Sequence, residues 1–356
     1  MKKSIGIAMI LLLLTGIMLN PMGCGKQVEN GNNENSVTEN GEAEKENLIK
    51  IGFSQVGAES DWRKANTESM KETFAAQNGY ELIFSDAQQK QTNQITAIRT
   101  FIQREVDYIV LAPVTEDGWD TVLSEAKEAG IPVIIVDRMV NVEDESLFAC
   151  WVGSDFKLEG DKVCQWLKEY SDSSDIEGEN LNIVSIQGTI GASSQLGRSA
   201  GLNGAVAKYG WNLLEEAEGE YTQARAREVM SAMLKKYNNI NVVYCENDNE
   251  AFGVIEAIEA AGKIPGEKIE RGQIMVLSFD GVSKQAINLA KEGKISCIGE
   301  CNPLHGPRVK KIIESLERGE VPDKFEYVTE SVFSKLDKIK TITVNNETYP
   351  VTILGN

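Results

Sequence analysis

The chain has a single histidine, His305, among its 356 residues, and its six cysteines follow no compact spacing. A zinc site needs several histidine or cysteine ligands at short intervals, so this class of site is excluded. A Ser-His-Asp triad needs a nucleophile at a strand end and an orienting acid, and nothing frames His305 in this way. We therefore expect a structural role for His305, with no catalytic residue, no metal and no cofactor.

The cysteines also argue against a disulfide framework. Cys24 adjoins a predicted leader, and an odd number remains beyond it: Cys150, Cys164, Cys245, Cys297 and Cys301. The last two fall in one predicted strand, where four residues at about 3.3 Å each hold the Cα atoms too far apart to bridge. We expect these cysteines to be buried, inert thiols.

Basic residues are scarce as well. Lysine and arginine number 36 against 54 acidic residues, which gives a net charge of -18. Such a charge repels the phosphate backbone, so we expect no nucleic-acid partner. A dispersed acidic surface is the simplest account of this composition.

Residues 1–23 are typical of a secretory signal peptide. Lys2 and Lys3 precede the apolar run 5–19, which is short for a membrane span but suits the core of a signal. We therefore expect the mature protein to lie outside the cytoplasm.

Cys24 directly follows the small residue Gly23, which predicts cleavage there and a lipoprotein anchored to the membrane by lipid on Cys24. An ordinary signal peptide with an incidental cysteine remains the alternative, and it would leave the protein free in the periplasm. Residues 27–47 are rich in Asn, Glu and Gly and poor in large apolar residues, so we expect residues 24–47 to form a flexible tether.

From Leu48 onward, strand and helix signals alternate, which predicts an α/β fold with parallel sheets flanked by helices. About 310 residues at roughly 150 per domain predict two domains. Breaks in the alternation, before residue 148 and after Glu300, predict crossings between two similar lobes. The predicted strands are 49–54, 80–85, 108–112, 133–136, 148–152, 182–186, 212–216, 242–245, 274–279 and 295–299.

The two breaks and a third expected crossing near Ser331 bound the expected lobes. The N-terminal lobe comprises residues 48–153 and 302–330, and the C-terminal lobe comprises 154–301 and 331–356. Three crossings, near Ser154, Cys301 and Ser331, would form the hinge between them. The tail from Asp337 to Asn356 matches no assigned function, but two strands joined by an Asn-Asn turn are expected there.

Polar side chains follow several of the predicted strands. The apolar run 132–136 ends in Asp137 and Arg138, which we expect to pair with each other. Ligands bind at the carboxyl edge of an open α/β sheet. For this pair alone a structural ion pair is an equal alternative, but clusters from both halves predict a cleft between the lobes. The clusters are Ser54-Gln55, Asp137-Arg138, Glu246-Asn247-Asp248, Asp280-Gly281 and Glu300-Cys301-Asn302.

The composition of these clusters indicates the ligand class. Acids, amides and an arginine both accept and donate hydrogen bonds, which suits a neutral molecule rich in hydroxyl groups. A phosphate ligand would require more cationic and backbone donors.

Two loops add to the predicted cleft. Residues 57–63 precede a helix, with Ser60 or Asp61 as N-cap, and bring Trp62 and Arg63 to the cleft mouth. Trp62 either stacks on a sugar ring or sits in the helix-sheet core, and both interpretations stay open.

The second loop, 188–194, is rich in glycine but lacks the Gly-Lys-Ser/Thr ending of a phosphate-binding loop. We expect it to offer backbone donors beside Thr189, with Arg198 one turn further along the helix.

Taken together, these motifs resemble the ribose-binding-like family of bacterial periplasmic sugar-binding proteins, and within it the galactofuranose-binding proteins most. The resemblance covers residues 48 to about 335. It is carried by IGFSQVGAESDWR at 51–63, DAQQKQ at 86–91 with Asn93-Gln94, APV at 112–114, Asp137-Arg138, QGTIGA at 187–192, END at 246–248 and Asp280-Gly281.

The resemblance implies a two-lobed periplasmic binding protein of type I. It implies the substrate-binding lipoprotein of a sugar ABC transporter, which works as a monomer with a membrane permease and captures a galactofuranose-like monosaccharide by hinge closure. The alternative is a sensor that presents sugar to a membrane receptor or histidine kinase. The residues implied in binding are Ser54, Gln55, Glu59, Trp62, Arg63, Asp137, Arg138, Thr189, Arg198, Tyr221, Asn247, Asp280 and Glu300.

Three further comparisons narrow this interpretation. Ribose binders of the family carry adjacent phenylalanines near the first strand end, and their absence here argues against ribose. A sugar-responsive repressor would require an amino-terminal helix-turn-helix in place of the leader. A glycosidase would require two carboxylates flanking a scissile bond, whereas isolated acids are expected in a polyol-binding site.

Overall fold

The computed structural model describes residues 48–355. The predicted signal peptide, the predicted lipidation site Cys24 and the predicted tether lie outside these residues. Within them, no helix combines the length and the hydrophobicity that crossing a bilayer demands.

The first sheet has six parallel strands in the order β11-β5-β4-β3-β1-β2. We call this sheet and its helices the first lobe. Its strands are β1 (Ile49–Gln55), β2 (Tyr80–Asp86), β3 (Tyr108–Leu111), β4 (Val133–Val136), β5 (Cys150–Gly153) and β11 (Phe325–Tyr327).

Strand β4 shows why helices cover both faces of this sheet. Successive side chains of a strand point to opposite faces, so Ile134 packs with helices α1 (Asp61–Thr73) and α9 (His305–Glu317). Ile135 packs on the other face with α2 (Gln91–Gln103) and α3 (Asp120–Glu128). The predicted strand buried on both faces is therefore confirmed.

The second sheet has eight strands in the order β13-β14-β12-β10-β9-β8-β6-β7. We call this sheet and its helices the second lobe. Its first five strands along the chain are parallel: β6 (Asn182–Gln187), β7 (Asn212–Glu218), β8 (Val242–Cys245), β9 (Met275–Asp280) and β10 (Cys297–Glu300).

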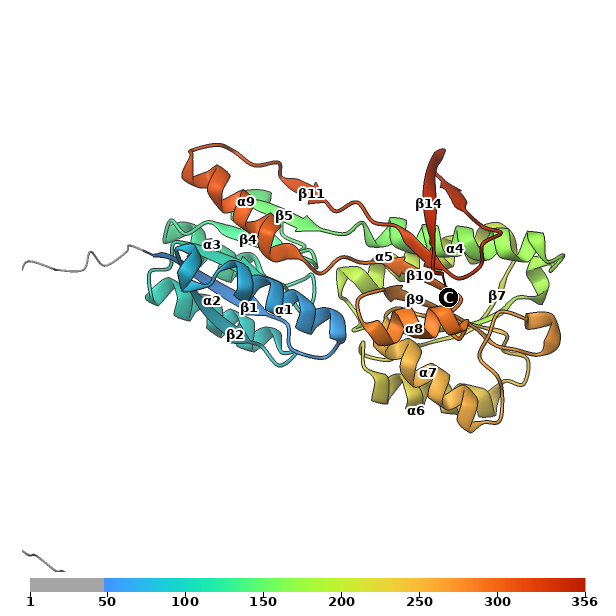
Figure 1. Cartoon of the computed structure of the whole chain (residues 1–356). Helices are drawn as coiled ribbons and strands as arrows, with labels where there is room; N and C mark the ends of the chain where they lie inside the picture. The colour runs from blue at the N-terminus through green and yellow to red at the C-terminus, as the bar shows by residue number, and fades with distance from the viewer. Residues whose placement is uncertain (1–47, 356) are drawn as a thin grey trace, which may run out of the picture. The chain divides into compact units, whose positions relative to one another are not determined.

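Helices cover both faces of the second sheet in the same way (Figure 1). One face packs on α4 (Phe156–Ser173) and α5 (Ser193–Tyr209). The other face packs on α6 (Gln223–Lys236), α7 (Asp248–Ala260) and α8 (Lys284–Glu292).

Three connections join the two sheets. The chain leaves β5 for α4 through residues 154–155, and it leaves β10 for α9 through residues 301–304. It then returns from β11 to β12 (Val332–Ser334) through residues 328–331. Figure 1 shows α9 and β11, from the carboxyl-terminal part of the chain, lying beside β5 of the first lobe.

The short strands β11 and β12 were not among the predicted strands, and β12 departs from the predicted parallel arrangement. It pairs antiparallel with β10, with Gly299 opposite Val332. The reason is geometric: β10 ends where the chain leaves the second lobe and β12 begins where the chain re-enters it. The intervening helix α9 packs on the first sheet and does not carry the chain back along the second, so the returning strand runs in the opposite direction.

The tail forms the predicted two strands. Strands β13 (Thr341–Val344) and β14 (Glu347–Ile353) pair antiparallel. Asn345 and Asn346 between them have φ angles of 52° and 68°. Two consecutive residues in the left-handed region are what a type I′ hairpin turn requires, and asparagine tolerates that region well.

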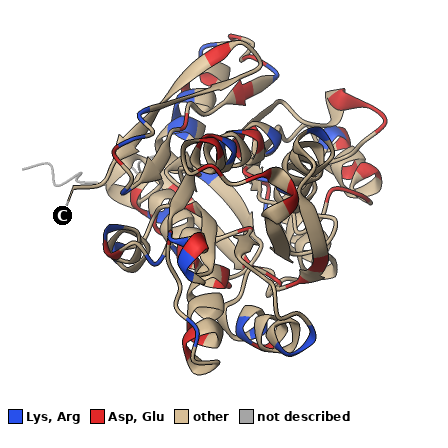
Figure 2. Ribbon diagram, turned by 90° about the vertical axis from the view of Figure 1, so that its right-hand side faces the viewer, with Lys and Arg blue, Asp and Glu red and all other residues tan. Residues whose placement is uncertain are grey.

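The described cysteines, Cys150, Cys164, Cys245, Cys297 and Cys301, are free and buried, which confirms that prediction. Charged residues of both signs are spread over the helices and loops in the view of Figure 2. Several form ion pairs one helical turn apart, such as Lys157–Asp161 on α4. Such pairs are common on a solvated helix surface and contribute little to stability.

Candidate functional site

A cavity of about 290 Å³ takes its walls from both lobes. The first lobe contributes residues from α1 and from the end of β4, and the second lobe contributes residues from α4, α5 and the ends of β8 and β9. The lining residues are Glu59, Ser60, Trp62, Arg63, Asp137, Arg138, Phe156, Ser194, Arg198, Tyr221, Asn247, Asp280 and Cys301.

On the first-lobe side, Arg63 stands between two acids. Its Nη2 lies 2.8 Å from Asp137 Oδ2, and its Nε lies 3.0 Å from Glu59 Oε1. Ser60 caps α1 by accepting the Arg63 backbone N–H, which resolves the choice of N-cap. Burial by itself lowers the pKa of Arg63, but the two carboxylates outweigh burial and raise that pKa above its ordinary value.

Arg138 is not the partner of Asp137, so the predicted pairing is wrong. Asp137 has a φ of 63°, in the left-handed region, and its ion pair reaches across to α1. Arg138 instead donates from Nη1 to the Val114 carbonyl at 2.7 Å, and its Nη2 lies 3.9 Å from Glu59 Oε1.

The Arg138 Nε atom is buried and has no hydrogen-bond partner among residues 48–355. Burial lowers the pKa of Arg138, and the neighbouring Arg63 lowers it further. A guanidinium donor left unpaired in a buried site is costly, so this atom is available to an acceptor in the cavity.

Arg198 is the corresponding cation of the second lobe. It donates from Nε to Glu159 Oε2 at 2.8 Å and from Nη1 to the Glu246 carbonyl. Its Nη2 lies 3.6 Å from Asp280 Oδ1. The guanidinium is also held above the ring of Phe279, 4.7 Å from its centroid. These contacts fix the plane of the guanidinium at the cavity wall.

Asp280 sits at the end of β9 as Asp137 sits at the end of β4. Its φ of 99° is unusual for a residue other than glycine and places its side chain beside the cavity. Behind it, Asp248 accepts hydrogen bonds from the Gly281 N–H at 2.8 Å and the Ser278 hydroxyl at 2.6 Å. Burial raises the pKa of Asp248 to about 7.

Tyr221 is held in position from three sides. Its backbone N–H donates to Glu250 Oε1 at 2.9 Å, and its hydroxyl lies 2.7 Å from Ser194 Oγ. A Cβ atom at Gly188 would lie 1.9 Å from the Tyr221 ring, so only glycine leaves room for the ring there. Asn247 caps α7 and donates to the Tyr221 carbonyl.

Trp62 lies at the cavity wall and belongs to neither apolar core of the first sheet. Its ring lines the cavity, yet it is only 4% exposed and packs with Phe156 and Cys301. Its Nε1 donates to the Cys301 carbonyl at 2.9 Å, which spans from α1 to the connection after β10. The ring also packs beside His305, with ring centroids 5.9 Å apart.

Four predicted binding residues lie outside the cavity lining. Gln55 supports the site from behind, because its Oε1 accepts from Arg63 Nη1 at 3.1 Å. Ser54 is buried within β1, so its side chain faces the helix layer. Thr189 forms a turn with Ala192, and Glu300 accepts the Ser331 N–H at 2.8 Å.

Ser60, Phe156, Ser194 and Cys301 line the cavity but were not predicted to bind ligand. Ser194 was placed by the sequence at the end of the glycine-rich loop 188–194, but it lies in the first turn of α5. Phe156 is the first residue of α4, directly after a connection between the lobes. Its position next to a predicted crossing is the signal that would have identified it.

The arrangement can be compared with known proteins. The family model for the periplasmic binding protein domain matches residues 51–303. A galactofuranose-binding protein of Escherichia coli is 35% identical over 305 residues, which cover 83% of this chain and 92% of that protein. The chain belongs to the periplasmic binding protein family. The predicted resemblance to sugar-binding members of this family is thereby confirmed.

Solved structures of the family agree. A protein of Mycobacterium smegmatis in complex with β-D-fucofuranose is 38% identical, with a TM-score of 0.75, and the match covers 81% of this chain and 91% of that one. The binding protein of an arabinose ABC transporter from Shewanella, bound to α- and β-L-arabinofuranose, is 39% identical with a TM-score of 0.73. That match covers 80% of this chain and 91% of the other.

Proposed function

We propose that this periplasmic binding protein is the substrate-binding component of a sugar ABC transporter and that it captures one furanose monosaccharide, such as galactofuranose. The observation that carries the proposal is the composition of the cavity. It sets two arginine–carboxylate pairs, Arg63–Asp137 and Arg198–Asp280, against an aromatic wall that includes Trp62. Paired donors and acceptors suit adjacent hydroxyl groups, and an aromatic face suits the apolar side of a sugar.

The size of the cavity supports a small ligand. About 290 Å³ of empty space, part of it open to solvent, lies among its lining residues. Space of that order suits one monosaccharide ring rather than an oligosaccharide. Three relatives at 35–39% identity are a galactofuranose-binding protein, a protein in complex with β-D-fucofuranose and a protein bound to L-arabinofuranose. These sugars support the five-membered ring form for the ligand of this chain.

Both lobes must approach the sugar for all of these contacts to form. Direct hydrogen bonds between the lobes close the rim of the cavity: the Asp61 N–H donates to Asn249 Oδ1, and the Met139 N–H donates to Ser193 Oγ, each at 2.9 Å. Sugar therefore favours the closed arrangement, because only there are both sets of polar groups within reach.

The lobes proposed for this motion are residues 48–153 with 302–330 and residues 154–301 with 331–356. They move about the connections at Ser154, Cys301 and Ser331. Lipid on Cys24 would hold the mature protein at the membrane surface, beside the permease that receives the sugar. The residues that bind the sugar would be those lining the cavity.

A calorimetric screen of monosaccharides against the mature protein tests this proposal. We expect one-to-one binding of a sugar that has a furanose form, and no released product when a galactofuranoside is incubated at steady state. Methyl furanoside and methyl pyranoside pairs then separate the ring forms. Steady turnover, or the absence of binding by every monosaccharide tried, would overturn the proposal.

A further inference from the structure

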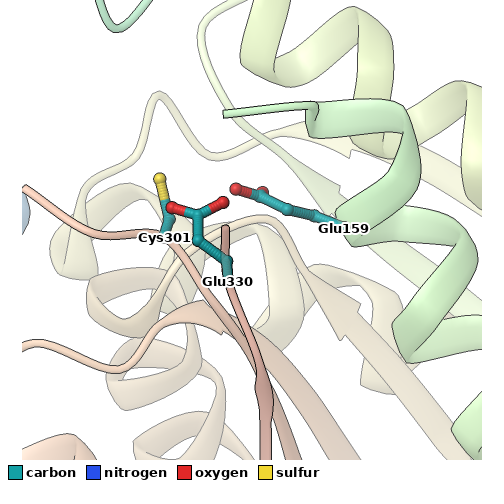
Figure 3. A group of neighbouring side chains, drawn as sticks. All are labelled: Glu159, Cys301 and Glu330. Carbon is teal, nitrogen blue, oxygen red and sulfur yellow. The ribbon is translucent and has the colours of Figure 1, made fainter. Parts of the chain in front are cut away.

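Glu159, Cys301 and Glu330 form a buried cluster where the lobes connect (Figure 3). One oxygen of each carboxyl group and the Cys301 sulfur all lie within 4.8 Å of one another. Glu159 comes from α4, and the other two residues come from the connections that follow β10 and precede β12. Only 3% of Glu159 and 7% of Glu330 is exposed, so water cannot screen the two acids from each other.

The Glu330 side chain ties the three connections together. Its Oε1 accepts a hydrogen bond from the Ser154 hydroxyl at 2.8 Å, in the first connection. The same atom accepts the Asn302 N–H at 2.6 Å, in the second connection. Because Glu330 itself lies in the third connection, a rotation of the lobes changes its surroundings.

Glu159 links this cluster to the cavity. Its Oε2 accepts from Arg198 Nε at 2.8 Å. Its Oε1 is buried and has no hydrogen-bond partner in the described part of the chain. A buried carboxylate oxygen without a donor, facing a second carboxyl group, is costly unless one of the two groups is protonated.

The surrounding charges favour a proton over a metal ion. Arg198 already occupies one oxygen of Glu159, and Lys162 donates to the Glu330 carbonyl at 2.8 Å. These cations repel a further cation, whereas a proton needs only one oxygen from each acid. The charged and titratable groups that face the pair are Arg198 from α5, Lys162 from α4, Arg308 from α9, Asp280 from β9 and Cys301.

The titration of the pair agrees with the geometry. Burial raises the pKa of Glu330 to about 9, and the adjacent Glu159 adds to the rise. Burial also raises the pKa of Glu159, although Arg198 opposes this effect. Two interacting acids lose their protons in two separate steps that belong to the pair, and between these steps the pair holds one proton.

We propose that Glu159 and Glu330 share one proton in the closed arrangement and that opening of the lobes separates them and releases it. The pair has a positioning role. Glu159 orients Arg198 at the cavity wall, and Glu330, itself in the third connection, accepts hydrogen bonds from the other two connections. This inference rests on the proposed function. Sugar binding would then take up a proton, so the affinity for sugar falls as the pH rises from the ordinary glutamate range towards about 9.

Calorimetry of the full mature protein in buffers with different ionisation enthalpies counts this proton. At pH 7.5, with the monosaccharide that binds wild type, we expect uptake of about one proton. Because binding takes up this proton, the affinity for sugar falls by up to about tenfold for each unit by which the pH rises. Sugar binding without any proton uptake by wild type overturns the inference, whatever the variants do. A wild-type protein that binds no sugar contradicts the proposed function instead.

Glu330→Gln identifies the pair as the source. Its amide oxygen still accepts from Ser154 and Asn302, and its amide nitrogen donates permanently to Glu159. We expect proton uptake to drop by about one and the affinity at neutral pH to stay within a few-fold of wild type. Glu326→Gln, the same change at a partly exposed position on β11, should match wild type. Equal proton uptake by wild type and a folded Glu330→Gln variant would refute the proposal.

Discussion

Arg63 Nη2 lies 2.8 Å from Asp137 Oδ2, which joins the first turn of α1 to the end of β4. In the second lobe, Arg198 approaches Asp280 at the end of β9 in the same way. Both acids have φ angles in the left-handed region, 63° and 99°. Each lobe thus presents an acid after a buried strand, held by an arginine from a neighbouring helix.

Asp137→Ala should lower the affinity for sugar by roughly 2–4 kcal/mol, because it removes an acceptor and leaves Glu59 as the only carboxylate that pairs with buried Arg63. Calorimetry of the folded variant measures the change. Asp86→Ala is a suitable control, since Asp86 ends β2, the edge strand of the same sheet, but is exposed and lies outside the cavity lining. Equal affinities of wild type and Asp137→Ala would show that the pair is purely structural.

The strand-end acids could be predicted because apolar runs ended abruptly in polar residues. The partner of Asp137 could not, since it depends on a left-handed backbone angle that turns the side chain away from Arg138 and towards α1. Arg138 was predicted as the partner because it adjoins Asp137 in the sequence, but Arg63 is the residue that pairs with Asp137 in the folded protein.

Strands β11 and β12 could not be predicted from sequence patterns, for a different reason. Each has three residues, too few for a periodic signal to stand out. Their existence depends on pairing with β5 and β10, which are distant in the sequence. The tail hairpin was predictable because its Asn-Asn turn carries a local signal.

Gly188→Ala should weaken sugar binding about tenfold to a hundredfold. The added methyl group would meet the Tyr221 ring at 1.9 Å, and displacing a packed ring costs roughly 1–3 kcal/mol. Gly204→Ala is the matched control, because nothing lies within 4 Å of its added Cβ on α5. That control should keep the affinity and gain roughly 0.5–1 kcal/mol in the free energy of unfolding. Undiminished affinity in Gly188→Ala would mean that the Tyr221 ring makes no contribution.

His305 should make the folded protein sensitive to mild acid. Burial lowers its pKa from 6.5 to about 4, with Arg308 and Arg63 acting in the same direction against Asp137. Between these two pH values the unfolded chain binds a proton that the folded chain does not. The free energy of unfolding therefore falls as the pH drops from about 6.5 to 4, by up to roughly 3 kcal/mol.

His305→Phe keeps an aromatic ring against Trp62 and removes the titration. Urea unfolding at pH 7 and at pH 4.5 should show a smaller acid-induced loss of stability in the variant than in wild type. Above pH 6.5, the histidine contributes no pH dependence. Parallel losses in the two proteins would show that His305 does not titrate in this window.

Closure of both lobes on a single small sugar is the central claim, and small-angle scattering with and without ligand tests it most directly. The cavity draws Arg63 and Asp137 from the first lobe and Arg198 and Asp280 from the second, so bound sugar should hold the lobes together. We predict a smaller radius of gyration at saturating, calorimetrically verified sugar than in its absence. Identical scattering curves under those conditions would contradict closure about the three connections.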